Sequence, residues 1–570
     1  MPAKTLRALL CLLLAGHLAG LLAHFHPSYA SPDASGTFVQ ARRIADDGAL
    51  TLEAESPLRY FGVPWLETED GRFVSRYPPG LAAALAVVRR VAGPTATLLV
   101  NPILATLTVL LVFLIVRRFA GDGGGLLAAI LLAVVPVANR QALHADSHTA
   151  AAFLLAAGVL LLLRWRERPS AARAIAAGFV LGALPTVRYA EGLVAVGIGL
   201  FLLLETGRGR APRSHLVAAA AGALVPIAPL LVVHRRLLGS PFRTAYDLTH
   251  EQTAFAADAL LDHAAPYLAS FSREAVGPWL AIGLLGAGGL LCVRRERSVG
   301  ALVLGACLPL GALYLSYYWG APGEPTNRFF VPLVPLLLLG GFAALARLDA
   351  RTTGAGRVLA RGALTAAVLV QAALFAVESG RRLAREEIGL ARGAAVEAWL
   401  DEHAAAGDVV IANRAVQGAL EREGRYRLVD DRLVPGGPRR AVVRTRNPNL
   451  RFQQDRTDGA SPSPHQHDKA ASLRRRYEGK SEREQAALVL DDLRAWADGR
   501  AVWWLATREE IDRFTALAPP GTRFEPAGEI ELPTPESRLL DLVDPDFDAT
   551  ARRLPYWVIE PPLTAWRWAE

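Results

Sequence analysis

The sequence predicts a polytopic α-helical membrane protein that ends in a soluble α/β domain. Of its 570 residues, 52% are hydrophobic and 20% are charged, a balance that fits neither a purely soluble nor a purely buried chain. Apolar runs long enough to cross roughly 30 Å of hydrocarbon lie before residue 378, and the composition beyond it is that of a soluble protein. We therefore expect a membrane domain over residues 1–378 and a second domain over residues 379–570.

About eleven apolar runs are candidate membrane spans. They start near Leu6, Thr97, Gly124, Thr149, Ala171, Glu191, His215, Val276, Val299, Phe329 and Arg357. If the amino terminus with Lys4 and Arg7 is cytoplasmic, arginine-rich connections such as RRFAGDGGG and RWRERPSAAR all become cytoplasmic, as the positive-inside rule requires. We thus expect a multi-pass protein of the cell (inner) membrane with an extracytoplasmic second domain.

The first apolar run is either an anchor or a cleaved signal peptide. The small residues SYA before Ser31 suit a cleavage site. Cleavage would remove one span and spoil the agreement with the charge rule, so we favour an uncleaved anchor.

The net charge of +8 does not indicate nucleic-acid binding, because the arginines cluster at the ends of apolar runs. The three cysteines, Cys11, Cys292 and Cys307, all lie inside apolar runs, where they are typical of small buried side chains. Neither redox chemistry nor a disulfide framework is indicated.

The first external loop, residues 28–96, contains the stretch SRYPPGLAAALAVVRR. Pro78 and Pro79 fix φ near the value of a first helical turn and need no backbone donor there, so a helix should start at Gly80. Ending near Arg90, this helix is too short to cross the bilayer upright. We expect it to lie along the outer membrane surface, with a short tilted span as the alternative.

The second domain shows helix and strand patterns around two short apolar runs, DVVIA and AVWWLA. Such runs are typical of strands covered by helices on both faces. A polar segment near residues 451–485, rich in Asp, Arg, Ser and Pro, should form a mobile loop.

The order of these features resembles the GT-C class of membrane glycosyltransferases, which includes the protein O-mannosyltransferases and the aminoarabinose transferase of lipid A. The resemblance covers residues 1 to about 378 and rests on an anchor span, a long external loop with an early acid, the element GRFVSRYPPG and the late span NRFFVPLVPLLLL. It implies an inverting transfer of a sugar from a polyprenyl-phosphate donor to a hydroxyl of a glycan, lipid or protein acceptor at the outer membrane face. Surface helices would then wall a cavity open to membrane lipids, and no nucleic acid would be bound.

Asp33 is the candidate catalytic base, because an attacking hydroxyl must lose its proton to a nearby carboxylate. The catalytic aspartate of the family matches this position soon after the first span. Relatives often carry a second acid or an aromatic next, whereas Ala34, Ser35 and Gly36 follow here. The alternative role is a helix N-cap for the run from Ala34 to Asp46.

Asp146 is the second candidate acid, in the stretch NRQALHADSHTAAAF at the mouth of a span. We expect it to orient the donor or acceptor. His144 and His148 are four residues apart and would share a face if the helix has already begun. That spacing can hold a divalent metal, but polar anchors explain it as well, so we expect no metal or other cofactor.

Arg76, Arg188 and Arg328 are candidate phosphate ligands, because the leaving phosphate needs fixed cations and the planar fork of arginine suits it. All three would lie on the outer side, against the charge bias, and Arg328 has the strongest family match. Arg188 has the alternative of pairing with Glu191, and Arg76 of binding lipid headgroups. Tyr77 would stack on a sugar or belong to the interfacial aromatic belt.

Two other classes of function are compatible with this pattern. A transporter or flippase of lipid-linked saccharides should show paired broken helices and buried ionisable residues at mid-membrane, which the sequence does not indicate. A membrane sensor or scaffold with an external domain would leave the outer arginines and acids unexplained. Convergence of Asp33, Arg188 and Arg328 on one cavity would favour the enzyme.

Overall fold

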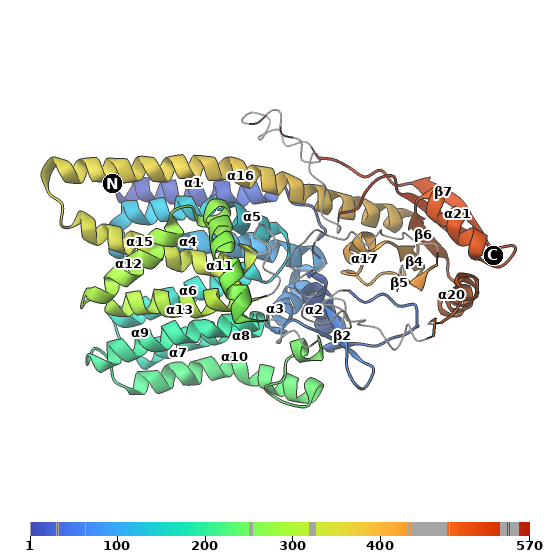
Figure 1. Ribbon diagram of the computed structural model, residues 1–570, viewed down its shortest axis with the longest axis horizontal. Helices are drawn as coiled ribbons and strands as arrows, with labels where there is room; N and C mark the ends of the chain where they lie inside the picture. The colour runs from blue at the N-terminus through green and yellow to red at the C-terminus, as the bar shows by residue number, and fades with distance from the viewer. Residues whose placement is uncertain are drawn as a thin grey trace.

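The computed structural model describes residues 2–29, 31, 33–62, 64–249, 255–317, 327–430, 433–435, 476–477, 479–535, 544, 547 and 558–569. A bundle of long helices occupies one end of the molecule and a small sheet with its helices the other, and α2, α3 and β2 lie between the two (Figure 1). This architecture confirms the predicted fold class.

The bundle consists of helices of very different length. They are α1 (Ala3–Leu22), α4 (Pro94–Ala133), α5 (Pro136–Leu143), α6 (His148–Glu167), α7 (Ala171–Gly182), α8 (Leu184–Val187), α9 (Ala195–Gly207), α10 (Ser214–Leu238), α11 (Ala257–Phe271), α12 (Trp279–Cys292), α13 (Arg297–Leu315), α15 (Val334–Asp349) and α16 (Gly354–His403), with the shorter turns η1 (Tyr189–Val194), η2 (Ala245–Thr249), η4 (Ser272–Val276) and η5 (Arg328–Leu333). In the described part of the chain, eight helices are long and apolar enough to cross a membrane, or nine if the bent pair Ala264–Val276 and Trp279–Cys292 forms one span. The chain is a multi-pass integral membrane protein.

The predicted starts fall on or next to these helices but do not give eleven separate spans. The runs from Thr97 and Gly124 are two helices within the stretch labelled α4, and they meet at Gly121, where φ is +68° and ψ is −177°. Glycine allows this backbone conformation at little cost. The run from Ala171 stops at Gly182, and the four-residue α8 with Pro185 in its first turn follows. The 12 residues of α7 are too few to cross the membrane as one helix.

The segment between α1 and α4, residues 23–93, is called the first loop. It contains α2 (Ser35–Asp47), the strands β1 (Thr51–Leu52), β2 (Trp65–Glu67) and β3 (Phe73–Ser75), and α3 (Gly80–Ala92). The strands form an antiparallel sheet in the order β1-β3-β2, and α3 packs on α2.

Helix α3 starts at Gly80, as the proline pair predicts, and it ends at Ala92, close to the predicted end near Arg90. Its 13 residues are only about 20 Å long at 1.5 Å per residue, so the alternative of a tilted span is wrong on length. Leu81 and Leu85 are buried, whereas Val87 and Val91 are 63% and 82% exposed. One face of α3 therefore packs on the protein, and another face carries exposed apolar side chains.

The second domain is built on a five-stranded sheet in the order β5-β4-β6-β8-β7. Its strands are β4 (Val409–Ala412), β5 (Arg427–Asp430), β6 (Val502–Ala506), β7 (Arg523–Glu529) and β8 (Thr564–Ala569), and its helices are α17 (Arg414–Leu420), α20 (Glu482–Ala497) and α21 (Arg508–Leu517). Strands β4, β5 and β6 are parallel, and β8 runs antiparallel to β6. The predicted strands DVVIA and AVWWLA correspond to β4 and β6.

Alternate residues of β4 face two separate cores, as the two-residue period of a strand requires. Val409 and Ile411 pack with α20 and α21, whereas Val410 and Ala412 pack with α17 and the end of α16. Helices therefore cover both faces of the sheet, as expected for an α/β domain.

Helix α16 joins the two parts of the molecule. It runs along the bundle and reaches the sheet domain (Figure 1), and its 50 residues continue without interruption through residue 378, where we placed the domain boundary. Of the predicted mobile loop near 451–485, residues 451–475 lie outside the described residues, and α20 begins at Glu482 behind a capping box with Ser481.

Candidate active site

Arg328 brings the two predicted acids together. Its Nη2 donates to Asp33 Oδ2 at 2.8 Å, and its Nη1 lies 3.7 Å from Asp146 Oδ2. Asp33 stands two residues before α2, Asp146 lies in the turn between α5 and α6, and Arg328 begins η5. Three residues from distant parts of the sequence thus form one cluster, which we call the Arg328 cluster.

Asp33 is partly open, with 21% of its side chain exposed. Burial raises the pKa of its carboxyl, but the guanidinium groups of Arg328 and Arg76 and the hydroxyl of Tyr77 lower it more, so the net pKa is well below the usual range. The alternative role as N-cap is wrong, because the cap residue of α2 is Ala34 and no side chain caps the helix. Asp33 is an accessible, ionised carboxylate.

Asp146 differs from Asp33 because it is buried, with 5% of the residue exposed. The turn that carries it passes through Ala145, whose φ is +62°, a strained value for a residue other than glycine. Asn101 Nδ2 donates to its carbonyl at 2.7 Å, and the backbone N–H of His148 donates to its Oδ1 at 3.2 Å. With its amide turned to satisfy both groups, Gln141 donates to both carboxyl oxygens. Burial raises the pKa of Asp146 despite the opposing effect of Arg328.

Arg188 is engaged by the protein itself. Its Nε donates to Glu191 Oε1 at 2.7 Å, its Nη2 to the Tyr314 hydroxyl at 3.2 Å and its Nη1 to Ser147 Oγ at 3.1 Å. The pairing with Glu191 is therefore present, and Arg188 supports the turn beside Asp146 without contacting Asp33.

Phe329 contacts both Arg328 and Arg188 with its ring, and sequence reasoning missed it. Arg328 Cζ lies 5.3 Å and Arg188 Cζ 5.8 Å from the centre of its ring, distances at which cation–π attraction operates. Its position next to Arg328 in NRFFVP was the available signal.

Arg76 and Tyr77 complete the Asp33 side of the cluster. Arg76 is 4% exposed, and its Cζ lies 5.9 Å from the ring of Tyr246. Tyr77 is half-buried, and burial together with the neighbouring Asp33 charge raises the pKa of its hydroxyl well above the usual value. Tyr77 thus stays a neutral hydroxyl near Asp33.

The two histidines near Asp146 do not share a helical face, because the helix has not yet begun at His144. His144 follows α5 and His148 begins α6, with the turn at Ala145 between them. His144 Nδ1 lies 2.5 Å from Glu386 Oε1 of α16, whereas His148 Nε2 lies 3.7 Å from Asp146 Oδ2. Among the described residues, no group of three or more His, Cys, Asp or Glu side chains is arranged to hold a metal ion.

A pocket shares Tyr77 with the Arg328 cluster. It is also lined by Gln40, Ser75, Tyr189 and His234. The Tyr189 hydroxyl lies 2.9 Å from His234 Nε2, and the buried Gln40 Oε1 has no hydrogen-bond partner in the part of the chain that is described. Amide, hydroxyl and aromatic groups of this kind can bind a sugar.

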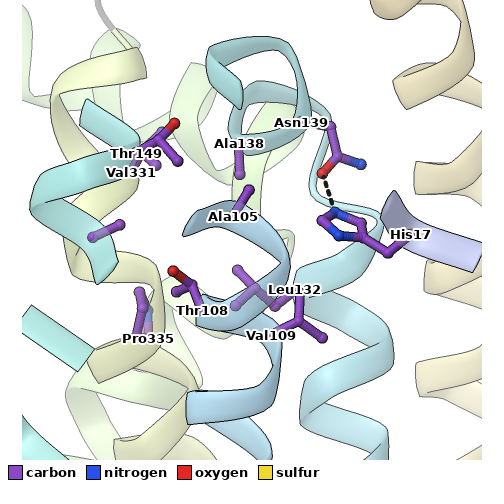
Figure 2. Close-up of a pocket in the computed structure, with 11 residues that line it drawn as sticks. His17, Ala105, Thr108, Val109, Leu132, Ala138, Asn139, Thr149, Val331 and Pro335 are labelled. Atoms are coloured by element: carbon purple, nitrogen blue, oxygen red, sulfur yellow. Dashed lines mark hydrogen bonds between the residues drawn. The ribbon is translucent and has the colours of Figure 1, made fainter. Parts of the chain in front are cut away.

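A second pocket lies inside the bundle, lined by residues of α1, α4, α5, α6, η5 and α15. Figure 2 shows Thr108, Val109, Leu132 and Pro335 around it, and His17 at its rim hydrogen-bonded to Asn139, with 3.0 Å between His17 Nε2 and Asn139 Oδ1. Its wall is mainly apolar.

Known proteins share both sequence and fold features with this chain. Residues 76–233 match the family described as dolichyl-phosphate-mannose-protein mannosyltransferase. Comparison with curated proteins gave no match. The structure of ArnT from Cupriavidus metallidurans in the apo state is similar, with 13% identity, a TM-score of 0.58, and 99% of this chain and 98% of that chain covered.

Two structures of the oligosaccharyltransferase of Archaeoglobus fulgidus are more distant. The complex with zinc and sulfate has 13% identity and a TM-score of 0.46, covering 73% of this chain and 62% of that chain. AglB with an inhibitory peptide and a dolichol-phosphate has 12% identity and a TM-score of 0.47, covering 86% and 71%. This chain therefore spans less than two thirds of the first archaeal chain, and scores this low support no detailed comparison.

The partial family match and the fold shared with ArnT agree with the resemblance to the GT-C class. The family model covers residues 76–233 only, whereas the fold shared with ArnT extends over nearly the whole chain.

Proposed function

We propose that the protein is an inverting glycosyltransferase that moves a sugar from a polyprenyl-phosphate donor to an acceptor hydroxyl at the outer face of the membrane. The observation that carries the proposal is the pairing of Arg328 with an ionised, partly exposed Asp33. The pairing supports the proposed roles of Asp33 as base and Arg328 as phosphate ligand, because the two side chains are in direct contact.

In the proposed reaction the acceptor oxygen attacks the anomeric carbon of the donor. Its proton passes to the Asp33 carboxylate, a new bond forms between the anomeric carbon and the acceptor oxygen, and the bond to the phosphate oxygen breaks. The electron pair of that bond leaves with the lipid phosphate. One displacement of this kind inverts the anomeric configuration.

The leaving phosphate gains negative charge, and the Arg328 cluster offers fixed cations for it. Arg328 and Arg76 both act on the Asp33 carboxylate, so both guanidinium groups lie near the reacting atoms. Arg328 Nε is buried and has no hydrogen-bond partner within the described residues, which leaves it one donor for an anion. Arg188 is better assigned to support of the turn that carries Asp146.

The assignment to the outer face rests on the arginine bias of the connections between helices. Reporter fusions after Arg118 and Arg210 should report the cytoplasm, and a fusion at the carboxyl terminus the opposite side. A carboxyl-terminal reporter in the cytoplasm would contradict this orientation.

The reaction is tested with purified protein in detergent and a set of defined polyprenyl-phosphate sugars. We expect sugar transfer to a hydroxyl acceptor, and nuclear magnetic resonance of the product should show the anomeric configuration opposite to that of the donor. A product of retained configuration would overturn the single displacement. Absence of transfer from every lipid-linked donor, with transfer from a nucleotide sugar, would overturn the donor class.

A further inference from the structure

The second domain holds the chain on both sides of Asp33. Arg422 Nη2 donates to the carbonyl oxygen of Pro27 at 3.0 Å, and Ser35 Oγ donates to Glu421 Oε2 at 2.7 Å. Glu421 and Arg422 are consecutive residues directly after α17. Asp33 lies between Pro27 and Ser35 in the sequence, so one corner of the second domain contacts the chain before and after the candidate base.

Both carboxyl oxygens of Glu421 are used in this contact. While Oε2 accepts from Ser35, Oε1 accepts from the backbone N–H of Gly62 at 3.2 Å. Glu421 is 6% exposed, and burying a carboxylate is costly unless such partners satisfy it. A Cβ on Gly62 would lie 2.1 Å from Ser35 Oγ and 2.6 Å from Glu421 Oε2, so only glycine allows the approach.

The edge of the second-domain sheet fixes the same part of the first loop. The backbone N–H of Tyr60 donates to the carbonyl of Leu428 in β5 at 2.8 Å, and Arg59 forms an antiparallel bridge with Val429. The first loop therefore extends the sheet beyond β5 just before Gly62. A continuous path of contacts leads from β5 through Gly62 and Glu421 to Ser35, two residues from Asp33.

We propose that Glu421 is a positioning residue for Asp33, and that the second domain serves to hold the base of the transfer reaction in place. This inference rests on the proposed function, since it takes Asp33 as the base. Glu421 acts through Ser35 and Gly62. A displacement of a reacting group by about 1 Å can lower the rate on the order of a hundredfold. The contacts of Arg422 with Pro27 and of Glu421 with Ser35, which we call the clamp, should therefore affect the rate directly.

The test is a double-mutant cycle with steady-state kinetics. We expect Glu421→Ala to lower kcat by roughly ten- to a hundredfold, with a much smaller change in the KM of the donor. In an Asp33→Asn background the same substitution should lower kcat less than about threefold, because the clamp has no base left to position. Glu421→Gln, which keeps an acceptor oxygen, should recover part of the loss. The control is Glu402→Gln, at an exposed glutamate of α16, which should leave kcat unchanged.

Ser35→Ala keeps the proposal open to refutation if Glu421→Ala does not fold. It removes one hydrogen bond and leaves the second domain intact, and it should lower kcat on the order of fivefold in the same non-additive way. Equal losses in the two backgrounds, or wild-type kcat in folded Glu421→Ala, would overturn the positioning role.

Hydrogen exchange separates this inference from the proposed function. Residues 33–41 should exchange faster in Glu421→Ala than in the wild-type protein. If the wild-type protein transfers no sugar but residues 33–41 exchange faster in Glu421→Ala, the proposed function is contradicted and the structural role of Glu421 is supported. If the wild-type protein transfers sugar but exchange is unchanged in Glu421→Ala, only the positioning role of Glu421 is contradicted.

Discussion

The first loop and the turn between α5 and α6 each present one aspartate to Arg328, yet they place it in opposite surroundings. Asp33 is partly exposed and its pKa is lowered, whereas Asp146 is buried and its pKa is raised. A group that takes a proton from a substrate needs access and an ionised state, and Asp33 meets both requirements. We propose that these surroundings make one aspartate, Asp33, the reacting group and the other, Asp146, a supporting group.

The largest effect is expected for Asp33→Asn. Asparagine preserves size and removes the base, so transfer should fall on the order of a hundred- to ten-thousandfold while the protein still folds. Initial rates with saturating donor, together with a thermal unfolding midpoint, measure the change. Transfer near the wild-type rate would remove Asp33 from the reaction and direct attention to Asp146.

The next largest effect is expected for Arg328→Lys, because this substitution changes the residue that lies next to both aspartates. Lysine keeps the charge and loses the planar fork, so it cannot contact Asp33, Asp146 and a phosphate in the same way. We expect kcat/KM to fall by roughly ten- to a hundredfold, in line with the loss of a charge-assisted hydrogen bond. Wild-type turnover would mean that the phosphate is held elsewhere, with Arg76 the next residue to replace.

A smaller effect is expected for Asp146→Asn. The carboxylate accepts from Gln141 and from the backbone N–H of His148, and an amide oxygen can still accept one of these bonds. A supporting role predicts a fall in kcat/KM of about tenfold or less. A loss as large as that of Asp33→Asn would show that both aspartates take part in the chemistry.

The smallest effect is a pH dependence of stability with opposite signs at the two acids. Because the pKa of Asp146 is raised on folding, its contribution falls as pH rises from about 4 through the folded pKa. As the pH rises above about 4, the unfolding temperature of Asp146→Asn should therefore increase by a few degrees relative to that of the wild type. The pKa of Asp33 is lowered, so its contribution is complete above about pH 4 and is lost as pH falls. The unfolding temperature of Asp33→Asn should thus fall relative to that of the wild type as pH rises toward 5. The same trend for both variants would contradict the opposite pKa shifts of the two aspartates.

Local sequence signals predicted much of the fold and part of the site. The proline pair before Gly80 predicted α3, and the apolar runs DVVIA and AVWWLA predicted β4 and β6, because propensity and periodicity act over a few residues. Asp33 and Arg328 were identified by resemblance, and the structure brings them into contact.

The partners that hold the site were not predictable in this way. Glu386 contacts His144 across 242 positions of sequence, and Glu421 contacts Ser35 across 386. Neither glutamate lies in a pattern that distinguishes it from a solvated charge on a helix or in a loop. Their roles arise from tertiary packing between α16, the second domain and the first loop, which no local pattern encodes.

The most direct test of the division between the two aspartates is a comparison of kcat for Asp33→Asn and Asp146→Asn, measured side by side with one polyprenyl-phosphate sugar. We expect the loss at Asp33 to exceed the loss at Asp146 by about tenfold or more. Equal losses, or a larger loss at Asp146, would contradict it.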